Sequence, residues 1–308
     1  MKSVMMIELG GNSMAIIETA NLTKDYGNGK GIFDVNIQVK EGEVFGFLGP
    51  NGAGKTTTIR NLMGFITPDK GKCAILGMDC FMEAARIQKH LGYLAGEIAF
   101  LDDMKGLQLL NFIASMKRMK DTSRMKQLIE LFELDPRGKV KKMSKGMKQK
   151  LGIIIAFMAD PEVIILDEPT SGLDPLMQNR FIDLILEEKK RGKTILMSSH
   201  IFEEIERTCD RTAIIREGKI VAIEDMESLA QKKSKTYTVT LSDKTALEKL
   251  KSEGFLITKE EGFKISIQVK ENIPQVLSKL SKYPISDLEV KTQSLEEIFL
   301  HYYGKEGK

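Results

Sequence analysis

A glycine-rich turn that ends in Lys-Thr constrains this chain more than any other feature. Residues 49–57 have the sequence GPNGAGKTT and match the pattern G-x-x-x-x-G-K-[ST] in full. The apolar run Val44–Leu48 predicts a strand before the turn, and Thr56–Met63 predicts a helix after it. Glycines let consecutive backbone N–H groups converge on phosphate oxygens, and the helix N-terminus adds partial positive charge. The sequence therefore predicts a phosphate cradle made by Gly49, Pro50, Asn51, Gly52, Ala53, Gly54, Lys55, Thr56 and Thr57.

Two adjacent carboxylates end a second apolar run. Val163–Leu166 is followed by Asp167 and Glu168, and this run lacks the alternation of a half-exposed strand. Alone, such a pair would more often be solvated, but a phosphate cradle lies upstream of it. In proteins with this cradle the strand-end Asp holds Mg²⁺, together with the cradle hydroxyl. We therefore expect ATP and Mg²⁺ as cofactors, with Thr56 and Asp167 on the metal and Lys55 on the β- and γ-phosphates. Glu168 would be catalytic by orienting and polarising the attacking water.

Composition narrows the class of protein. The 308 residues are 42% hydrophobic and 29% charged, and 46 basic and 43 acidic residues leave a net charge of +3. This near balance argues against a dedicated nucleic-acid binder, so we expect no nucleic-acid partner. Cys73, Cys80 and Cys209 have no metal-ligand spacing, which favours reduced cysteines. The uncharged run Leu151–Ala159 is far shorter than the about 20 residues of a membrane-spanning helix.

The chain divides by pattern into a large and a small domain. Residues 14–230 predict one α/β domain, because helix-like stretches precede buried apolar runs such as Thr194–Met197. Residues 1–13 show no pattern and are expected to be a disordered leader or a start artefact. After a Lys-rich stretch, residues 236–308 predict a small accessory domain with the order β-α-β-β-α-β-α, a ferredoxin-like α+β unit. Within it we expect Ser242 to cap a helix and Ser294 to begin a capping box with Glu297.

A short motif before the acidic strand makes a family resemblance specific. Met143-Ser144-Lys145-Gly146-Met147 resembles the Leu-Ser-Gly-Gly-Gln signature of the ABC ATPase family, although Lys145 and Met147 depart from it. Three further matches follow the family pattern: Ser171–Asp174 resembles its D-loop, His200 its switch histidine and Tyr26 its adenine-stacking aromatic. The resemblance implies a P-loop NTPase of ABC type, with a helical subdomain at about residues 92–160.

The same resemblance implies roles for these residues. Two copies would face each other head to tail, and Ser144, Lys145, Gly146 and Met147 would contact the ATP held by the partner copy. Asp174 would make contacts across that dimer, and a catalytic His200 would contact the γ-phosphate. Tyr26 would stack on adenine.

One element of the family pattern is altered. Where the family has a glutamine that binds Mg²⁺ and senses a membrane partner, residues 92–97 have the sequence GYLAGE. Either Gly96 occupies the glutamine position and the ligand is lost, or Glu97 substitutes for it. A carboxylate can bind Mg²⁺, so our hypothesis assigns the role to Glu97.

The spacing between the motifs and the number of times each motif occurs indicate one branch of the family. About 90 residues separate Lys55 from Ser144, too few for the long coiled-coil arms of the repair-type members, and each motif occurs once. The chain resembles bacterial ABC-2-type export ATPases for drugs, antibiotics or sodium. The resemblance implies a peripheral subunit at the cytoplasmic face of the cell membrane. There it would drive a separate permease that exports a drug, antibiotic, lipid-like molecule or ion.

Two alternatives stay open at this stage. Phe100, Leu101 and Met104 either form a socket for a helix of the permease or pack internally, and the sequence does not separate the two. The rival function is a soluble regulatory ABC ATPase without a membrane partner.

Overall fold

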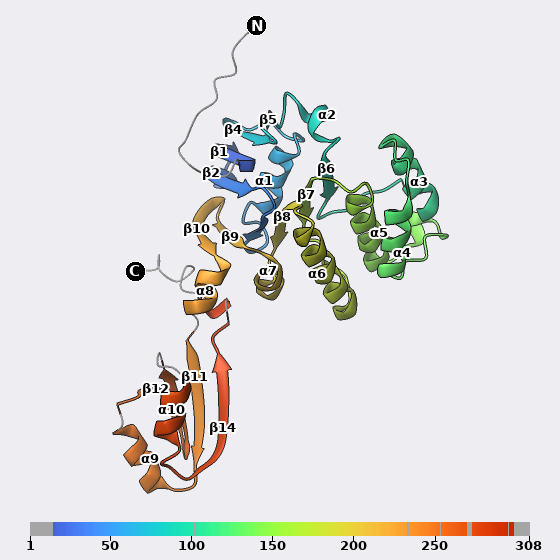
Figure 1. The fold of residues 1–308 in the computed structure, drawn as a ribbon. Helices are drawn as coiled ribbons and strands as arrows, with labels where there is room; N and C mark the ends of the chain where they lie inside the picture. Colours follow the sequence, from blue (N-terminus) through green and yellow to red (C-terminus); the bar gives the residue numbers. More distant parts are fainter. Residues whose placement is uncertain are drawn as a thin grey trace. The chain divides into compact units, whose positions relative to one another are not determined.

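The computed structural model of the chain describes residues 15–101, 103–232, 234–252, 254–269, 273–294 and 296–298. It divides into two compact units, the first ending at Met226 and the second beginning at Glu227 (Figure 1). The leader expected at residues 1–13 lies outside the described residues. Each unit is described by itself below.

A six-stranded sheet forms the centre of the first unit. Its strand order is β10-β9-β3-β8-β7-β6, and all neighbours are parallel except β9 and β10. The strands are β3 (Val44–Leu48), β6 (Leu91–Leu94), β7 (Val163–Asp167), β8 (Thr194–Ser199), β9 (Arg211–Arg216) and β10 (Lys219–Asp225). Every residue of β3, β7 and β8 is buried, and for β7 and β8 this confirms the prediction of strands buried on both faces.

Helices cover both faces of this sheet. In Figure 1, α1 (Lys55–Leu62) lies above the sheet, whereas α6 (Pro175–Lys190) and α7 (Phe202–Thr208) lie below it. A second, antiparallel sheet of order β2-β1-β4-β5 lies beyond α1. Its strands are β1 (Ala15–Asp25), β2 (Gly31–Lys40), β4 (Lys70–Ile75) and β5 (Met78–Asp79). One apolar core, to which Val35, Phe47 and Ile59 belong, joins the two sheets and α1.

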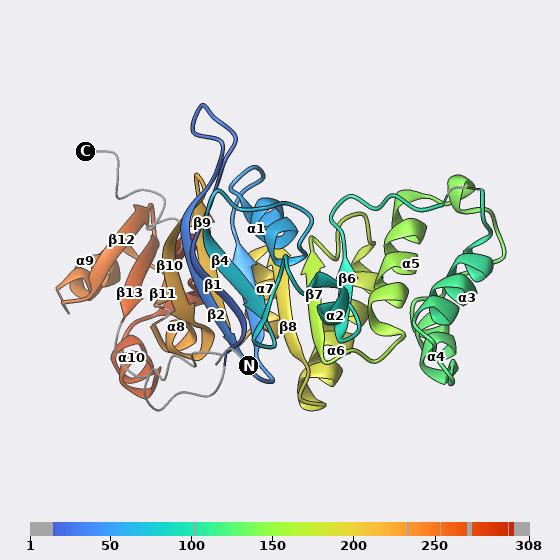
Figure 2. The same ribbon diagram turned by 90° about the horizontal axis from the view of Figure 1, so that it is seen from above.

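A group of helices extends beyond the β6 edge. These are α3 (Gly106–Met116), α4 (Ser123–Leu131) and α5 (Lys145–Phe157), with the 3-10 turn η1 (Val140–Lys142) before α5. Figures 1 and 2 both place them to one side of the sheet, whereas α2 (Ala84–Ile87) lies close to β6. Leu110, Leu128 and Ile154, one from each long helix, are fully buried. The turn that leads into α5 therefore belongs to a packed helical part of the unit.

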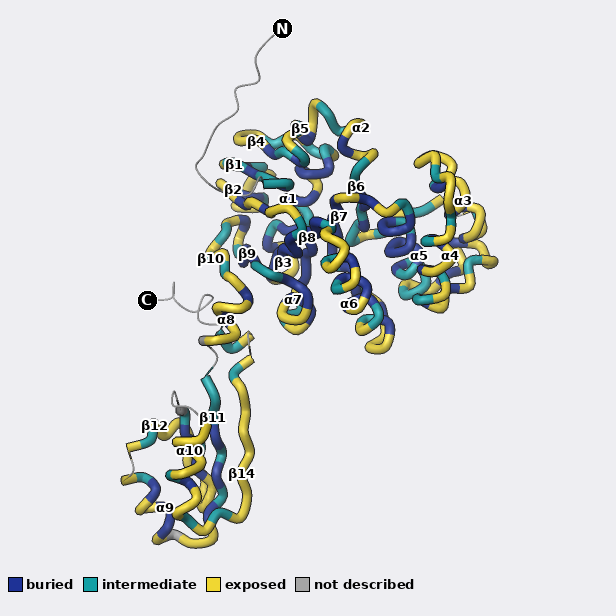
Figure 3. Tube along the Cα trace, viewed as in Figure 1, coloured by how far each residue is buried: buried dark blue, intermediate teal, exposed yellow. Residues whose placement is uncertain are grey.

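The second unit is a separate α+β domain. It begins within α8 (Met226–Lys232) and contains β11 (Lys235–Leu241), α9 (Lys244–Lys251), β12 (Leu256–Glu261), β13 (Lys264–Val269), α10 (Ile273–Leu280) and β14 (Ile285–Thr292). The sheet order is β12-β13-β11-β14, and all neighbours are antiparallel. With the order β-α-β-β-α-β this is the ferredoxin-like arrangement that the sequence predicted. Its core, dark blue in Figure 3, includes Tyr237 and Val239 from the sheet and Leu250 from α9.

The caps in this unit show one correct and one wrong prediction. Ser294 Oγ accepts from Glu297 N at 3.1 Å, and Ser294 N donates to Glu297 Oε2 at 3.2 Å, so the capping box is confirmed. The cap of α9 was expected at Ser242 but is Asp243, whose Oδ1 accepts from Ala246 N at 2.7 Å. Ser242 instead donates its hydroxyl to the carbonyl of Pro284 at 3.1 Å.

Candidate nucleotide-binding site

The turn between β3 and α1 has the backbone conformation of a phosphate cradle. Gly54, the residue before α1, has φ +113°, a value that L side chains rarely adopt. A Cβ atom at Gly54 would also lie 2.7 Å from the side chain of Ile32. Both observations require glycine here. Because α1 starts directly after this residue, its free N–H groups face the cradle.

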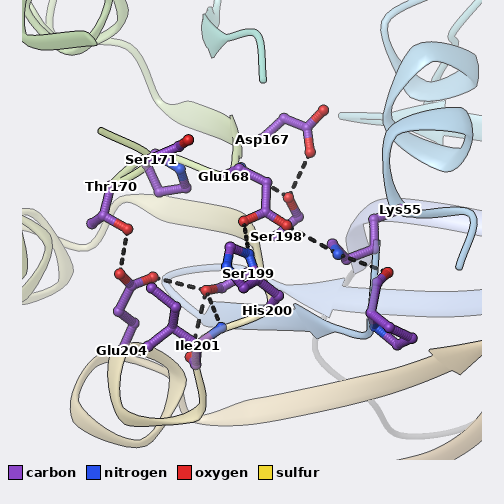
Figure 4. A network of polar contacts seen from close by, with 12 residues as sticks. Lys55, Asp167, Glu168, Thr170, Ser171, Ser198, Ser199, His200, Ile201 and Glu204 are labelled. Carbon is purple, nitrogen blue, oxygen red and sulfur yellow. Dashed lines mark hydrogen bonds and ion pairs between the residues drawn. The ribbon is translucent and has the colours of Figure 1, made fainter. Parts of the chain in front are cut away.

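The buried side chain of Lys55 is held by hydrogen bonds to the cradle backbone. Its side chain is 5% exposed, and its Nζ donates to the carbonyl oxygens of Gly49 at 2.6 Å and Pro50 at 3.2 Å. Nζ also lies 3.0 Å from Glu168 Oε1 (Figure 4). The ammonium group is thus positioned by backbone acceptors and balanced by one carboxylate.

Thr56 and Asp167 bring two oxygen donors together. Thr56 Oγ1 donates to Asp167 Oδ2 at 2.8 Å, and Asp167 has no exposed surface. A hydroxyl beside a buried carboxylate suits a hard cation such as Mg²⁺. Within the described ranges no group of three or more His, Cys, Asp or Glu could hold a metal ion.

Glu168 has a strained backbone that its neighbours hold in place. Its φ is +50°, in the left-handed region that non-glycine residues rarely adopt and that is enriched at functional sites. Glu168 N donates to Ser198 Oγ at 3.0 Å, and the same hydroxyl donates to Asp167 Oδ1 at 2.6 Å. From α5, Gln149 Nε2 donates to the carbonyls of Glu168 at 3.3 Å and Pro169 at 2.7 Å. Sequence reasoning missed Ser198 and Gln149, although a hydroxyl at the end of a buried strand was an available signal.

His200 faces Glu168 from the end of the next strand. Its Nδ1 lies 2.6 Å from Glu168 Oε2, and its side chain is 48% exposed. Figure 4 shows Lys55 and His200 approaching opposite oxygens of the same carboxylate. The structure therefore brings together the lysine, the acid and the histidine that the sequence singled out separately.

Tyr26 borders a cavity that opens on the cradle. The cavity holds about 460 Å³, and its lining includes Gly52, Lys55 and Thr57. Tyr26 is 54% exposed, so its ring is accessible from solvent. The turn between β9 and β10 closes another side of the cavity through Glu217, which no sequence motif indicated.

Gly96 and Glu97 border a second cavity, next to Thr56 and Asp167. This cavity holds about 590 Å³, and its lining includes Thr56, Asp167 and His200. A Cβ atom at Gly96 would lie 3.0 Å from Asp167 Oδ2, so Gly96 stands directly beside the carboxylate. Glu97 is exposed and lines the same cavity. Burial raises the pKa of Tyr93, also in the lining, to about 12, and the charge of Asp167 adds to the shift.

The signature and D-loop segments contact each other within one chain. Ser144 is the N-cap of α5, and its hydroxyl accepts from Met147 N at 3.2 Å. Lys145 Nζ donates to Ser171 Oγ at 2.9 Å. A Cβ atom at Gly146 would lie 2.8 Å from the carbonyl of Gly172, so this glycine permits close approach.

Asp174 caps the helix that follows the D-loop. Its carboxylate accepts from Met177 N at 3.0 Å at the start of α6. Asp174 is itself exposed, so the capping bond leaves part of its carboxylate open to solvent.

Of the three socket candidates, Leu101 is 56% exposed, whereas Phe100 and Met104 are partly buried. In the part of the chain that the structure describes, no helix combines the length and the apolar character needed to cross a bilayer.

A parallel sheet with a glycine cradle, a strand-end acid pair and a helical subdomain defines a P-loop nucleotide-binding cassette. Residues 32–171 match the family described as ABC transporter. Residues 225–303 match the C-terminal domain of the ATP-binding protein DrrA1-3-like family.

Relatives cover almost the whole chain. The uncharacterized ABC transporter ATP-binding protein YhcH of Bacillus subtilis (strain 168) is 35% identical over 94% of this chain and 96% of its own length. The bacitracin transport ATP-binding protein BcrA of Bacillus licheniformis is 36% identical, over 94% and 97%. The chain therefore belongs to the ATP-binding proteins of ABC transporters, which are ATPases that bind and hydrolyse ATP for transport.

Solved structures agree with this fold. An ATP binding subunit of an ABC transporter is 29% identical with a TM-score of 0.64, covering 70% of this chain and 92% of that one. The dimeric bacterial cassette MJ0796 has a TM-score of 0.62 at 23% identity, over 68% and 98%, and supports the fold alone.

Proposed function

We propose that this chain is the motor subunit of an exporter and drives a separate membrane permease. The exported molecule would be a drug, an antibiotic, a lipid-like molecule or an ion. Two similarities support this: the DrrA-like C-terminal match and the likeness to a relative named for bacitracin transport. The subunit would sit peripherally at the cytoplasmic face of the cell membrane, because its permease would hold it there.

The observation that carries the motor role is the convergence on Glu168. Lys55 and His200 contact its two oxygens at 3.0 Å and 2.6 Å, beside the Thr56–Asp167 pair. In the proposed reaction Lys55 and the cradle N–H groups bind the β- and γ-phosphates, while Thr56 and Asp167 hold Mg²⁺, with Glu97 as a further candidate ligand. Bound Mg²⁺ would neutralise charge that develops on the phosphates. Glu168 orients and polarises the attacking water, and His200 contacts the γ-phosphate. Tyr26 stacks on adenine.

The second half of each site would come from another copy of this chain. In a head-to-tail dimer, Ser144–Met147 would contact the ATP in the partner's cradle, and Asp174 would contact the partner copy. The exposed positions of Ser144, Lys145 and Asp174 are compatible with this.

The two units correspond to a proposed division of labour. The ATPase domain would span residues 14–230, with its helical subdomain at about 92–160, and residues 236–308 would form the accessory domain. Exposed Leu101, close in sequence to Glu97, is the candidate for contact with a permease helix. Replacing Leu101 by Asp should then uncouple transport from ATP hydrolysis.

The variant Glu168→Gln tests the motor role. The amide keeps the size of the side chain but cannot polarise water as a carboxylate does, so turnover should fall on the order of 100-fold or more. ATP binding should persist, because the cradle is unchanged. Hydrolysis is measured by phosphate release, and size-exclusion chromatography with ATP should show a trapped dimer. Full turnover in this variant would overturn the assignment of Glu168.

Association with a membrane protein tests the exporter role separately. A permease encoded beside this chain should co-purify with it in detergent, and Leu101→Asp should weaken that association. A stable complex with ribosomes or DNA, without any membrane protein, would instead support the soluble regulatory ATPase.

A further inference from the structure

Glu204 is a buried carboxylate beside the site that none of the sequence motifs explains. It lies in α7, four residues after His200, and only 4% of its surface is exposed. Burial raises its pKa, and the nearby charge of Glu168 adds to this rise. Burying an ionisable group costs free energy unless hydrogen bonds satisfy it. The hydrogen bonds of Glu204 therefore indicate which structural role this buried carboxylate has.

Two hydroxyl groups from different segments donate to this carboxylate. Ser199 Oγ donates to Oε2 at 2.8 Å, and Thr170 Oγ1 donates to Oε1. Both hydroxyls belong to buried residues, with exposed fractions of 1% for Ser199 and 3% for Thr170. Figure 4 shows Glu204 between the two, below the Glu168–His200 contact.

Each hydroxyl belongs to a turn that carries one functional side chain. Ser199 Oγ accepts from Ile201 N at 2.9 Å, which closes the turn around His200. Thr170 lies two residues after Glu168, in a turn closed by the bond from Ser171 N to Glu168 O at 3.2 Å. One carboxylate thus connects the turn of the histidine to the turn of the strained Glu168.

We propose that Glu204 is a positioning residue for ATP hydrolysis, because its carboxylate fixes the turn of Glu168 relative to the turn of His200. This inference rests on the proposed roles of Glu168 and His200. Glu204 itself contacts neither nucleotide nor water in the reaction. Its effect is on the distance and orientation between the two groups that do.

A carboxylate suits this task better than an amide does. Both of its oxygens accept, so both hydroxyls donate at once and Ser199 Oγ keeps a lone pair for Ile201 N. A glutamine offers one oxygen and one NH₂ group, and therefore accepts from only one of the two hydroxyls. The NH₂ group can instead donate to the other hydroxyl, so the isosteric change reverses one bond and replaces two bonds to a carboxylate by weaker neutral ones, without emptying the space.

The test compares isosteric variants in the full chain. Glu204→Gln and Thr170→Val should each lower kcat for Mg-ATP hydrolysis by about 10- to 100-fold, the size expected for a small displacement of catalytic groups. ATP affinity should stay within about twofold, because the groups that the variants change, the Glu204 carboxylate and the Thr170 hydroxyl, bond to each other and to Ser199 rather than to the cradle side chains. Thr170→Ser, which keeps the hydroxyl, should restore wild-type kcat. In the Glu204→Gln background, Thr170→Val should lower kcat only slightly further, because both changes affect the same bridge.

Glu188→Gln is the matched control for loss of a buried carboxylate. Glu188 is 2% exposed and pairs with Arg124 and Arg191, away from the site. The Glu188→Gln variant should have a lower melting temperature and an unchanged kcat. A purely structural Glu204 would behave in the same way, and that result would overturn the proposal. Wild-type kcat in Thr170→Val would also overturn the proposal. This second variant keeps the test decisive if Glu204→Gln fails to fold.

The proposed function and this inference can be refuted independently of each other. If Glu168→Gln retains full turnover, the role of Glu168 is wrong whatever the Glu204 variants do. If Glu168→Gln is inactive while Glu204→Gln and Thr170→Val are normal, only the role of Glu204 is refuted.

Discussion

At the scale of single residues, the site contains side chains that the sequence placed correctly and backbone features that it could not reveal. The motifs predicted which acid ends β7, because apolar runs and strand-end carboxylates have a sequence pattern. The left-handed conformation of Glu168 and its support by Ser198 and Gln149 depend on segments far apart in the chain. Such contacts leave no local pattern.

The altered glutamine loop gives a prediction at this scale. Gly96 stands beside Asp167 without a side chain and Glu97 lines the same cavity, so our proposal gives Glu97 the contact to the bound Mg²⁺. Glu97→Ala should raise the Mg²⁺ concentration for half-maximal hydrolysis by about tenfold, as loss of a supporting metal contact does. Glu97→Gln should stay close to wild type. Magnesium titrations of ATP hydrolysis measure this, and wild-type Mg²⁺ dependence in both variants would exclude the role.

Cys209 gives a prediction for alkaline pH. Burial raises the pKa of this thiol to about 12, from an ordinary value near 9.0. Above about pH 9 the unfolded chain loses this proton while the folded chain keeps it. The stabilisation is therefore complete below pH 9 and is lost as pH rises towards 12, by about 1.4 kcal/mol per unit within that window.

Urea unfolding between pH 8 and 10.5 measures this loss. Cys209→Ala should be less stable at pH 8, because it leaves a small cavity, but its free energy of unfolding should fall less steeply with pH. Parallel slopes in the two proteins would contradict the assignment.

At the scale of elements, apolar patterning was a reliable guide and capping was less so. The strands β3, β7 and β8 were predictable because burial on both faces demands continuous apolar runs. In the second unit, alternation placed Tyr237, Val239 and Leu241 on the buried face of β11. The cap of α9 was missed by one residue, because Ser242 and Asp243 are both good caps and the choice depends on the carbonyl of Pro284.

Helix α5 connects the helical part of the first unit to the loop of Glu168. Ser144, which the sequence singled out in the signature segment, is the N-cap of α5. What could not be foreseen is that Gln149, one turn further on, donates to the loop of Glu168. Residues at helical spacing from a motif are therefore worth testing even when no motif includes them.

At the scale of the whole molecule, the chain divides into two compact units, and the candidate nucleotide site belongs to one of them. Every residue assigned to nucleotide chemistry lies in the first unit, and the second unit builds its core from its own residues. A chain ending after α8, at Lys232, should therefore bind ATP within about twofold of the full chain. Calorimetric titration measures this, and a tenfold loss of affinity in a folded truncated chain would show that the second unit supports the site.

The contacts of Glu168 also have a consequence for turnover. Lys55 and His200 both have Glu168 as a negatively charged partner, so under the proposed mechanism a γ-phosphate would compete with a carboxylate for both. This competition would lower the affinity for ATP by the free energy of those contacts, and it would favour product release by the same amount. In the proposed mechanism the acid that prepares water for attack would thus also help to expel the inorganic phosphate, and its replacement should slow the emptying of the site as well as the reaction.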